Sequence, residues 1–102
     1  MQLIQILLPL IEKENKDSNF NLYTEIRKEL TEKFGGITTY TRSPATGSWK
    51  EEANKTVKDD IIIYEVMAQD LDKDWWEKYK QMMEKEFEQE EIIIRTWQID
   101  LL

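Results

Sequence analysis

The sequence predicts an α+β fold of the ferredoxin-like type, in which elements in the order βαββαβ place two helices on one face of a four-stranded antiparallel sheet. The first and last predicted strands, residues 3–8 and 92–99, begin as nearly unbroken apolar runs. Two segments with apolar residues at helical spacing alternate with strand-like segments between them. The chain has 102 residues, of which 40% are hydrophobic, so residues 1–102 are expected to form a single domain with one core.

The first predicted strand, residues 3–8, ends at Pro9, because proline cannot donate a ladder hydrogen bond and tends to lie at strand ends. The apolar run that contains it, residues 3–11, has no basic flank and no small-residue cleavage site, and it is too short to span a bilayer. We therefore assign this run to a buried strand and expect no membrane association.

The first predicted helix follows a polar connection, residues 12–19. Its apolar positions recur at helical spacing and would form one buried face: Tyr23, Ile26, Leu30 and Phe34. The candidates for its N-cap are Ser18, Asn19 and Asn21. Gly35 is expected to end the helix, because glycine adopts the left-handed conformation that closes many helices.

The second and third strands are predicted from two segments separated by a long connection. Residues 37–42 are rich in threonine and tyrosine, which suit a pleated surface, and residues 61–67 form the third strand. The connection, residues 43–60, includes Pro44 and Gly47, which break the strand pattern. We interpret it as a loop, and a loop of this length in a small domain is typical of a functional or mobile segment.

The second predicted helix begins near aspartates that can cap it and interact favourably with its dipole: Asp70, Asp72 and Asp74. Its buried stripe consists of Trp76, Tyr79, Met83 and Phe87. Trp75 is expected to cover part of the core rather than to offer a stacking surface to a ligand. Residues 92–99 form the last strand.

Strand alternation divides the sheet residues into two sets, because successive side chains point to opposite faces. The set expected beneath the helices is Ile4, Ile6, Leu8, Ile62, Tyr64, Val66, Ile92 and Ile94. The other set is Leu3, Gln5, Leu7, Ile61, Ile63, Glu65, Met67, Ile93, Arg95, Trp97 and Ile99. This second face is too apolar for a solvated surface.

We expect this second face to pair with the same face of another copy in a two-fold homodimer. Burying its eight large apolar side chains would contribute about 12 to 24 kcal/mol per subunit as an upper bound. That exceeds most estimates, about 4 to 15 kcal/mol, of the cost of association. The alternative is that the C-terminal residues or the long loop cover the face within one subunit.

Three polar residues interrupt the second face, and the ferredoxin-like strand order places Gln5 between Glu65 and Arg95. The backbones of Glu65 and Arg95 would lie two strand spacings apart, roughly 10 Å. We expect either a structural acid–base pair satisfied by Gln5, or polar anchors that orient a small organic ligand. Glu65 is also the best candidate for a catalytic base in a chain without histidine.

A second group of candidate ligand-binding residues lies near the second strand. Tyr40, Arg42 and Trp49 could form a polar and aromatic rim for an anionic or planar ligand, with Arg42 as the charged anchor. The alternative is that Tyr40 and Trp49 cover an edge of the sheet, while Arg42 pairs with a surface carboxylate.

Composition argues against several function classes. The chain has 21 Asp and Glu against 14 Lys and Arg, and its net charge of −7 repels nucleic acid and anionic lipid. Without histidine or cysteine it lacks the commonest metal ligand, the commonest general base and thiol chemistry. We expect no metal site and no cofactor, and a cytoplasmic location is compatible with the absence of cysteine. One acidic run is expected to be a solvated helix face: Glu84, Glu86, Glu88, Glu90 and Glu91.

Residues 34–50, FGGITTYTRSPATGSWK, resemble a segment of small uncharacterised bacterial proteins, and the βαββαβ layout resembles the dimeric α+β barrel superfamily. The resemblance implies a sheet-to-sheet dimer, with any pocket between sheet and helices or at the mouth of the barrel. The superfamily includes cofactor-independent monooxygenases, muconolactone-isomerase-like enzymes, haem degraders and ligand-sensing or stress proteins. The present chain lacks the histidine that haem-binding and metal-binding members use.

The sequence therefore favours a homodimeric small-ligand-binding or accessory domain. One alternative is a small cofactor-independent enzyme of the monooxygenase or isomerase type, with Glu65 and Tyr40 as candidate catalytic residues and Arg42 positioning the substrate. Another is a protein-interaction module that uses the predicted loop, residues 43–60.

Overall fold

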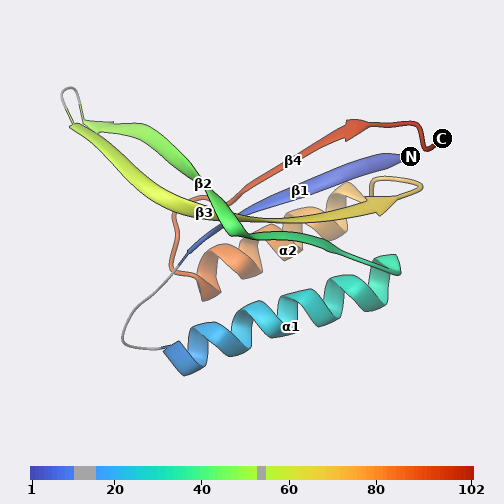
Figure 1. The fold of residues 1–102 in the computed structure, drawn as a ribbon, viewed down its shortest axis with the longest axis horizontal. Coiled ribbons are helices and arrows are strands. Elements are labelled where there is room, and N and C mark those ends of the chain that lie inside the picture. The colour runs from blue at the N-terminus through green and yellow to red at the C-terminus, as the bar shows by residue number, and fades with distance from the viewer. Residues whose placement is uncertain (11–15, 53–54) are drawn as a thin grey trace.

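The chain folds in the predicted order βαββαβ (Figure 1). The computed structural model describes the backbone of residues 1–10, 16–52 and 55–102, and the side chains of residues 1–10, 21–40 and 60–102. The elements are β1 (Gln2–Pro9), α1 (Lys16–Phe34), β2 (Thr38–Glu52), β3 (Lys55–Ala68), α2 (Lys73–Glu86) and β4 (Ile93–Gln98). The predicted α+β class is confirmed.

The four strands form one antiparallel sheet in the order β2-β3-β1-β4, so β1 and β3 are central and β2 and β4 are edge strands. Both helices lie on the same side of this sheet (Figure 1). The register places Gln5 of β1 directly opposite Glu65 of β3 and, on its other side, opposite Arg95 of β4. The other face of the sheet has no helix over it in the described part of the chain.

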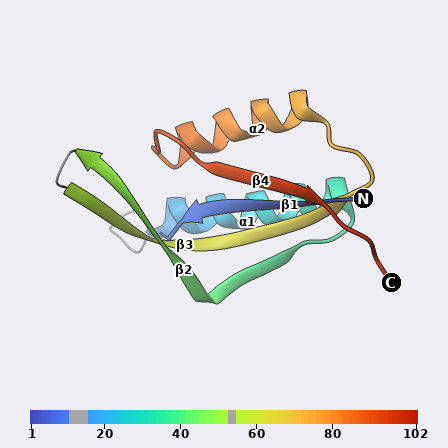
Figure 2. The same ribbon diagram turned by 90° about the horizontal axis from the view of Figure 1, so that it is seen from above.

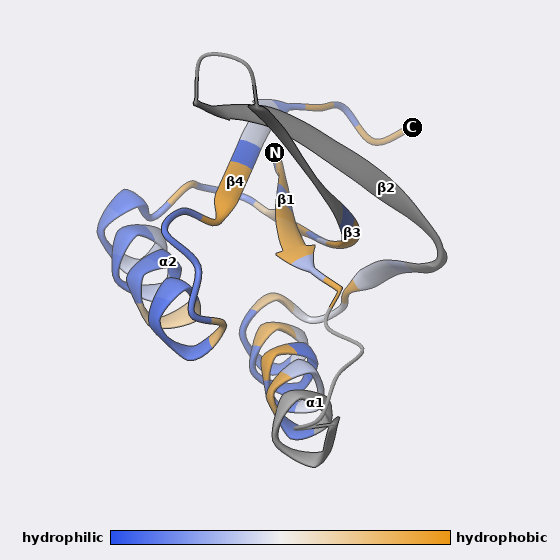
Figure 3. Cartoon of the chain, turned by 90° about the vertical axis from the view of Figure 1, so that its left-hand side faces the viewer, coloured by the Kyte–Doolittle hydropathy of each residue, from blue (hydrophilic) through white to orange (hydrophobic). Residues whose placement is uncertain are grey.

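The core lies between the sheet and the helices, as strand alternation predicts. The buried hydrophobic residues are Ile4, Ile6, Leu8, Ile26, Leu30, Ile62, Tyr64, Val66, Trp76, Tyr79, Met83, Phe87 and Ile92. Tyr23, Phe34 and Ile94 are partly buried against this cluster. Figure 3 looks along the sheet and shows the hydrophobic colour on β1 and on the start of β4, with the helices to one side. Every side chain predicted for the helix-covered face is therefore in the core or in contact with it.

The helix ends follow the predicted signals at two positions. Gly35 has φ 84°, and its N–H donates to the carbonyl of Thr31 at 2.8 Å, which closes α1. Asp72 is the N-cap of α2, and its carboxylate accepts a hydrogen bond from the backbone N–H of Trp75 at 3.1 Å. Neither described helix is long and apolar enough to cross a membrane.

The predicted start of α1 is wrong. The helix begins at Lys16, so the three candidate caps Ser18, Asn19 and Asn21 lie inside it. Serine and asparagine are less favourable than alanine inside a helix by less than about 0.7 kcal/mol per residue, so they are tolerated within its first turns. The side chains of Ser18 and Asn19 are outside the described residues, and Asn21 is exposed.

The predicted loop at residues 43–60 is also wrong. The backbone of β2 continues to Glu52 and that of β3 starts at Lys55, so the segment forms a long antiparallel hairpin in which, for example, Trp49 pairs with Val57. The outer part of this hairpin extends beyond the ends of the helices (Figure 2). The alternative of a protein-interaction module that uses residues 43–60 would therefore involve a hairpin rather than a loop, and it stays a prediction.

The hairpin keeps its pairing despite Pro44 because the register shifts between Tyr40 and Ala45. From Tyr40 to Ala45 β2 advances five residues while β3 advances two, so three extra residues of β2 leave the ladder, and a sheet tolerates proline at such an irregularity. Because strand pairing uses backbone groups, the hairpin does not need the apolar alternation on which the prediction relied.

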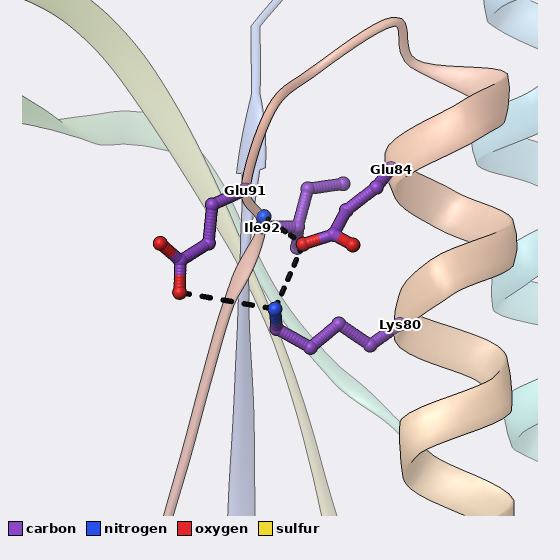
Figure 4. A network of polar contacts seen from close by, with 4 residues as sticks. All are labelled: Lys80, Glu84, Glu91 and Ile92. Carbon is purple, nitrogen blue, oxygen red and sulfur yellow. Dashed lines mark hydrogen bonds and ion pairs between the residues drawn. The ribbon is translucent and has the colours of Figure 1, made fainter.

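A polar network joins the end of α2 to the start of β4 (Figure 4). The Glu84 carboxylate accepts from Lys80 Nζ at 2.8 Å and from the Ile92 N–H at 2.9 Å, and Lys80 Nζ also lies 3.8 Å from Glu91. The Lys80 hydrogen bond, followed by that from Ile92, lowers the pKa of Glu84. The network connects α2 to Ile92, the residue before β4, whereas pairing with β1 places Arg95 on that strand.

Candidate functional site

A row of four hydrogen-bonded polar side chains crosses the open face of the sheet. The Tyr40 hydroxyl lies 3.4 Å from Glu65 Oε2, the Gln5 amide donates from Nε2 to Glu65 Oε1 at 2.8 Å, and Arg95 donates from Nε to Gln5 Oε1 at 3.0 Å. We call these four residues the polar row. One residue comes from each of the four strands, so the row crosses the sheet roughly perpendicular to the strands.

The position of Gln5 between Glu65 and Arg95 confirms the predicted geometry. The amide of Gln5 suits this position because it offers a donor to the acid on one side and an acceptor to the base on the other. It therefore connects two charged groups on strands that are not adjacent. Glu65 and Arg95 form no direct ion pair among the contacts of the described residues.

Tyr40 joins the row through a diagonal contact that the sequence did not predict. In the β2–β3 register Thr38 lies opposite Glu65, and Tyr40 lies opposite Ile63. Alternation places Thr38 and Tyr40 on the same face, and a tyrosine side chain is long enough to reach a diagonal neighbour. The two candidate catalytic residues, Tyr40 and Glu65, are therefore neighbours, although catalysis by them remains a prediction.

The surroundings of the polar row are apolar and exposed. The exposed fractions are 45% for Met67, 52% for Ile93 and 43% for Trp97. The remaining large apolar residues of this face are partly buried: Leu3, Leu7, Ile61, Ile63 and Ile99. We call this surface, with the polar row, the open face.

The C-terminal residues do not cover the open face. The Ile99 N–H donates to the Met1 carbonyl at 2.9 Å, so the chain continues alongside the start of β1. Leu101 and Leu102 are themselves exposed. The alternative in which this part of the chain shields the face is therefore wrong for the described residues, because Ile93 and Trp97 remain about half exposed.

Arg95 has unused binding capacity. Its guanidinium donates through Nε to Gln5, and its two terminal nitrogens have no acceptor among the described residues. Ile93 and Trp97 flank it on the same face of β4. The planar end of a guanidinium binds a carboxylate through two parallel hydrogen bonds, so Arg95 presents an open site for an acidic group.

A groove of ≈ 290 Å³ borders the polar row where α1 turns into β2. Its lining consists of Phe34, Gly35, Gly36, Ile37, Thr38, Glu65, Val66 and Met67. A second groove of ≈ 190 Å³ lies between α2 and β4, and its lining includes Trp76, Lys80 and Ile94. Only the first groove includes a member of the polar row.

Two predicted site residues cannot be placed with the polar row. The backbone of β2 contains Arg42 and Trp49, but their side chains lie outside the described residues. The rim that they were expected to form with Tyr40 therefore stays a prediction. Among the described residues, no three potential metal ligands come together.

The helix aromatics pack with one another. Trp76 is 5% exposed, and Trp75 stacks on Tyr79 with ring centroids 4.6 Å apart. Phe34 of α1 stacks on Trp76 at 5.4 Å, which ties the two helices together. The expectation that Trp75 covers the core is confirmed.

Two buried tyrosines carry polar groups whose environment the sequence did not reveal. The hydroxyl of Tyr64 accepts a hydrogen bond from Arg27 Nη1 at 2.9 Å, and burial raises its pKa although Arg27 acts in the opposite direction. The hydroxyl of Tyr79 makes no hydrogen bond of good geometry with the described residues, although the Glu29 carboxylate lies close enough to interact with it. Burial, and then the nearby Glu29 carboxylate, raise the pKa of Tyr79. Both hydroxyls belong to the core rather than to the open face.

Comparison with known proteins supports the fold. No protein-family profile and no curated protein sequence matches the chain. A point variant of CutA1 from Pyrococcus horikoshii OT3 has a TM-score of 0.57 and 13% identity, over 100% of this chain and 86% of that chain. Pyrococcus horikoshii CutA in guanidine hydrochloride has a TM-score of 0.58 and 13% identity, over 100% and 87%. This similarity shows the ferredoxin-like arrangement alone, and membership of the dimeric α+β barrel superfamily stays a prediction.

Proposed function

We propose that this protein is a homodimeric binding or accessory domain, in which the open faces of two copies pack against each other. The observation that carries the proposal is the polar row, a hydrogen-bonded series of side chains across a face that is otherwise apolar. Isolated surface apolar residues are ordinary, but here Met67, Ile93 and Trp97 are about half exposed on one continuous sheet face.

A second copy fits this face better than an unrelated partner does. Sheets that pack face to face bury alternating side chains at a spacing of about 10 Å, and each copy offers the same apolar area to the other. The net charge of −7 opposes association at long range, so the interface depends on the apolar contacts and on close charge pairs. The smallest closed assembly of this kind is a two-fold dimer.

The mass in solution tests the proposal. Light scattering on protein eluting from a sizing column, over a series of concentrations, should give twice the subunit mass of 12.3 kDa. A mass of one subunit at high concentration would refute self-association. A mass of three subunits would keep the possibility of contact through the open face but would replace the two-fold arrangement.

A small-ligand function is favoured by one observation, the groove of ≈ 290 Å³ beside Glu65. Gln5 and Tyr40 leave lone pairs of the Glu65 carboxylate free, so this groove suits a small molecule that carries a hydrogen-bond donor or an amine. Native mass spectrometry of freshly purified protein should detect a bound molecule that Glu65→Gln weakens. If the Glu65→Gln variant retains the molecule equally well, the assignment of Glu65 as its anchor is wrong.

A further inference from the structure

The polar row has a direction. Its acid, Glu65, lies on β3, its base, Arg95, lies on β4, and the neutral Gln5 lies midway on β1. These three residues occupy the same level of the sheet, because each is the direct register partner of its neighbour. A second copy packed on the open face therefore meets a negative group on one side of β1 and a positive group on the other.

We infer that the two-fold axis of the dimer runs parallel to the strands over β1, so that the terminal nitrogens of each Arg95 bind the carboxylate of the partner subunit's Glu65. This inference rests on the proposed function, since it requires a second copy on the open face. It goes beyond that proposal because it specifies which residues each copy contributes to the other.

The choice of axis follows from charge. An axis parallel to the strands exchanges the two sides of β1, so Glu65 of one copy faces Arg95 of the other and Gln5 faces Gln5. An axis along the row would instead place Glu65 over Glu65 and Arg95 over Arg95. Opposed like charges in a desolvated interface are strongly unfavourable, whereas opposite charges fix the register.

The described contacts are compatible with this pairing. The backbones of two sheets packed face to face are about 10 Å apart, a distance that an arginine and a glutamate from opposite sheets can span together. The terminal nitrogens of Arg95 are not used by any described acceptor, and the oxygens of Glu65 each have lone pairs beyond those used by Gln5 and Tyr40. Packing of the two open faces would also place Ile93 and Trp97 around each arginine–glutamate pair and exclude water from it.

Two single charge reversals test the arrangement. In Glu65→Arg, both pairs of the dimer become arginine against arginine, and in Arg95→Glu both become glutamate against glutamate. Each reversed pair should raise the dimer Kd roughly tenfold. Because the dimer contains two such pairs, each variant alone should have a Kd about 100-fold higher than that of the unmodified chain. An equimolar mixture of the two variants should recover dimers, because each mixed dimer contains two arginine–glutamate pairs.

The matched controls are Glu65→Gln and Arg95→Gln, which remove a charge without adding repulsion and should weaken association less than the reversals. Circular dichroism of each variant confirms folding, and recovery on mixing is a readout that an unfolded variant could not produce. If the unmodified chain is a dimer but the reversals dimerise equally well, or their mixture shows no recovery, the inferred axis is wrong while the proposed function stands. If the unmodified chain is a monomer, the proposed function itself is wrong.

Discussion

Replacing Ile93 by serine tests how much the open face contributes to association. Ile93 is 52% exposed in the single subunit, and complete burial of an isoleucine side chain contributes about 1.5 to 3 kcal/mol. Burying the exposed half would therefore contribute about 0.8 to 1.6 kcal/mol per copy. A two-fold interface contains the residue twice, so Ile93→Ser should raise the dimer Kd by roughly 10-fold to 200-fold.

Ile94→Ser is the matched control, because Ile94 neighbours Ile93 on β4 but packs against the core on the opposite face. Ile94→Ser should lower the free energy of unfolding by about 2 kcal/mol or more, whereas Ile93→Ser should lower that of the single subunit by about 1 kcal/mol, because half of the Ile93 side chain is already exposed. Sedimentation equilibrium measures the dimer Kd, and urea unfolding well below that Kd measures the subunit alone. An unchanged Kd in Ile93→Ser, or a loss of subunit stability equal to that in Ile94→Ser, would show that the open face is not the interface.

Three further predictions concern the fold that supports this face. Asp72→Ala removes the capping acceptor of α2 and should lower the free energy of unfolding by about 1 kcal/mol in urea. Tyr79→Phe deletes a buried hydroxyl that makes no hydrogen bond of good geometry, so stability at neutral pH should be unchanged or higher by up to about 1 kcal/mol, and a clear loss would show that the nearby Glu29 carboxylate accepts from it. Lys80 and the Ile92 N–H lower the pKa of Glu84 in the folded protein. The Glu84 carboxylate therefore contributes fully to the free energy of unfolding above its ordinary pKa of 4.5, and this contribution is lost as the pH falls through the lower pKa of the folded state. Glu84→Gln should therefore flatten this part of the stability–pH curve, as followed by thermal unfolding.

The sequence predicts the fold well where one side of an element is buried. Ile4, Ile6 and Leu8 alternate with residues of the open face, and their complete burial follows from that alternation. Trp76 and Met83 are likewise buried because helical spacing places them on one face of α2. In these segments a single physical cause, removal of apolar surface from water, determines both the pattern and the structure.

The same reasoning fails where no face is buried by the chain itself. The hairpin of β2 and β3 extends beyond the helices, so its outer residues have no reason to alternate between apolar and polar types. Backbone hydrogen bonds form it regardless of side-chain pattern, and Pro44 falls at the register shift that accommodates it. A proline and charged residues therefore indicated a loop where the backbone in fact remains paired.

The part of the candidate site that depends only on which strands are adjacent could be predicted from the sequence. Gln5 lies between Glu65 and Arg95 because the ferredoxin-like order places β1 between β3 and β4. The contact of Tyr40 depends on a diagonal approach next to a register shift. Sequence spacing carries no signal for that shift, so the hydrogen bond to Glu65 could not be predicted.

In the proposed dimer the polar row would have a role distinct from stability. Replacing Gln5, Glu65 and Arg95 by apolar residues would make the open face more hydrophobic, and buried ion pairs are often no more stabilising than such replacements. An entirely apolar face would, however, pair with itself in several registers and around either axis. A row that is acidic at one end and basic at the other makes the charge-matched arrangement more favourable than the rest. In that dimer the exposed terminal nitrogens of Arg95, for which no described residue of the same chain supplies an acceptor, would donate to the partner surface and fix the arrangement.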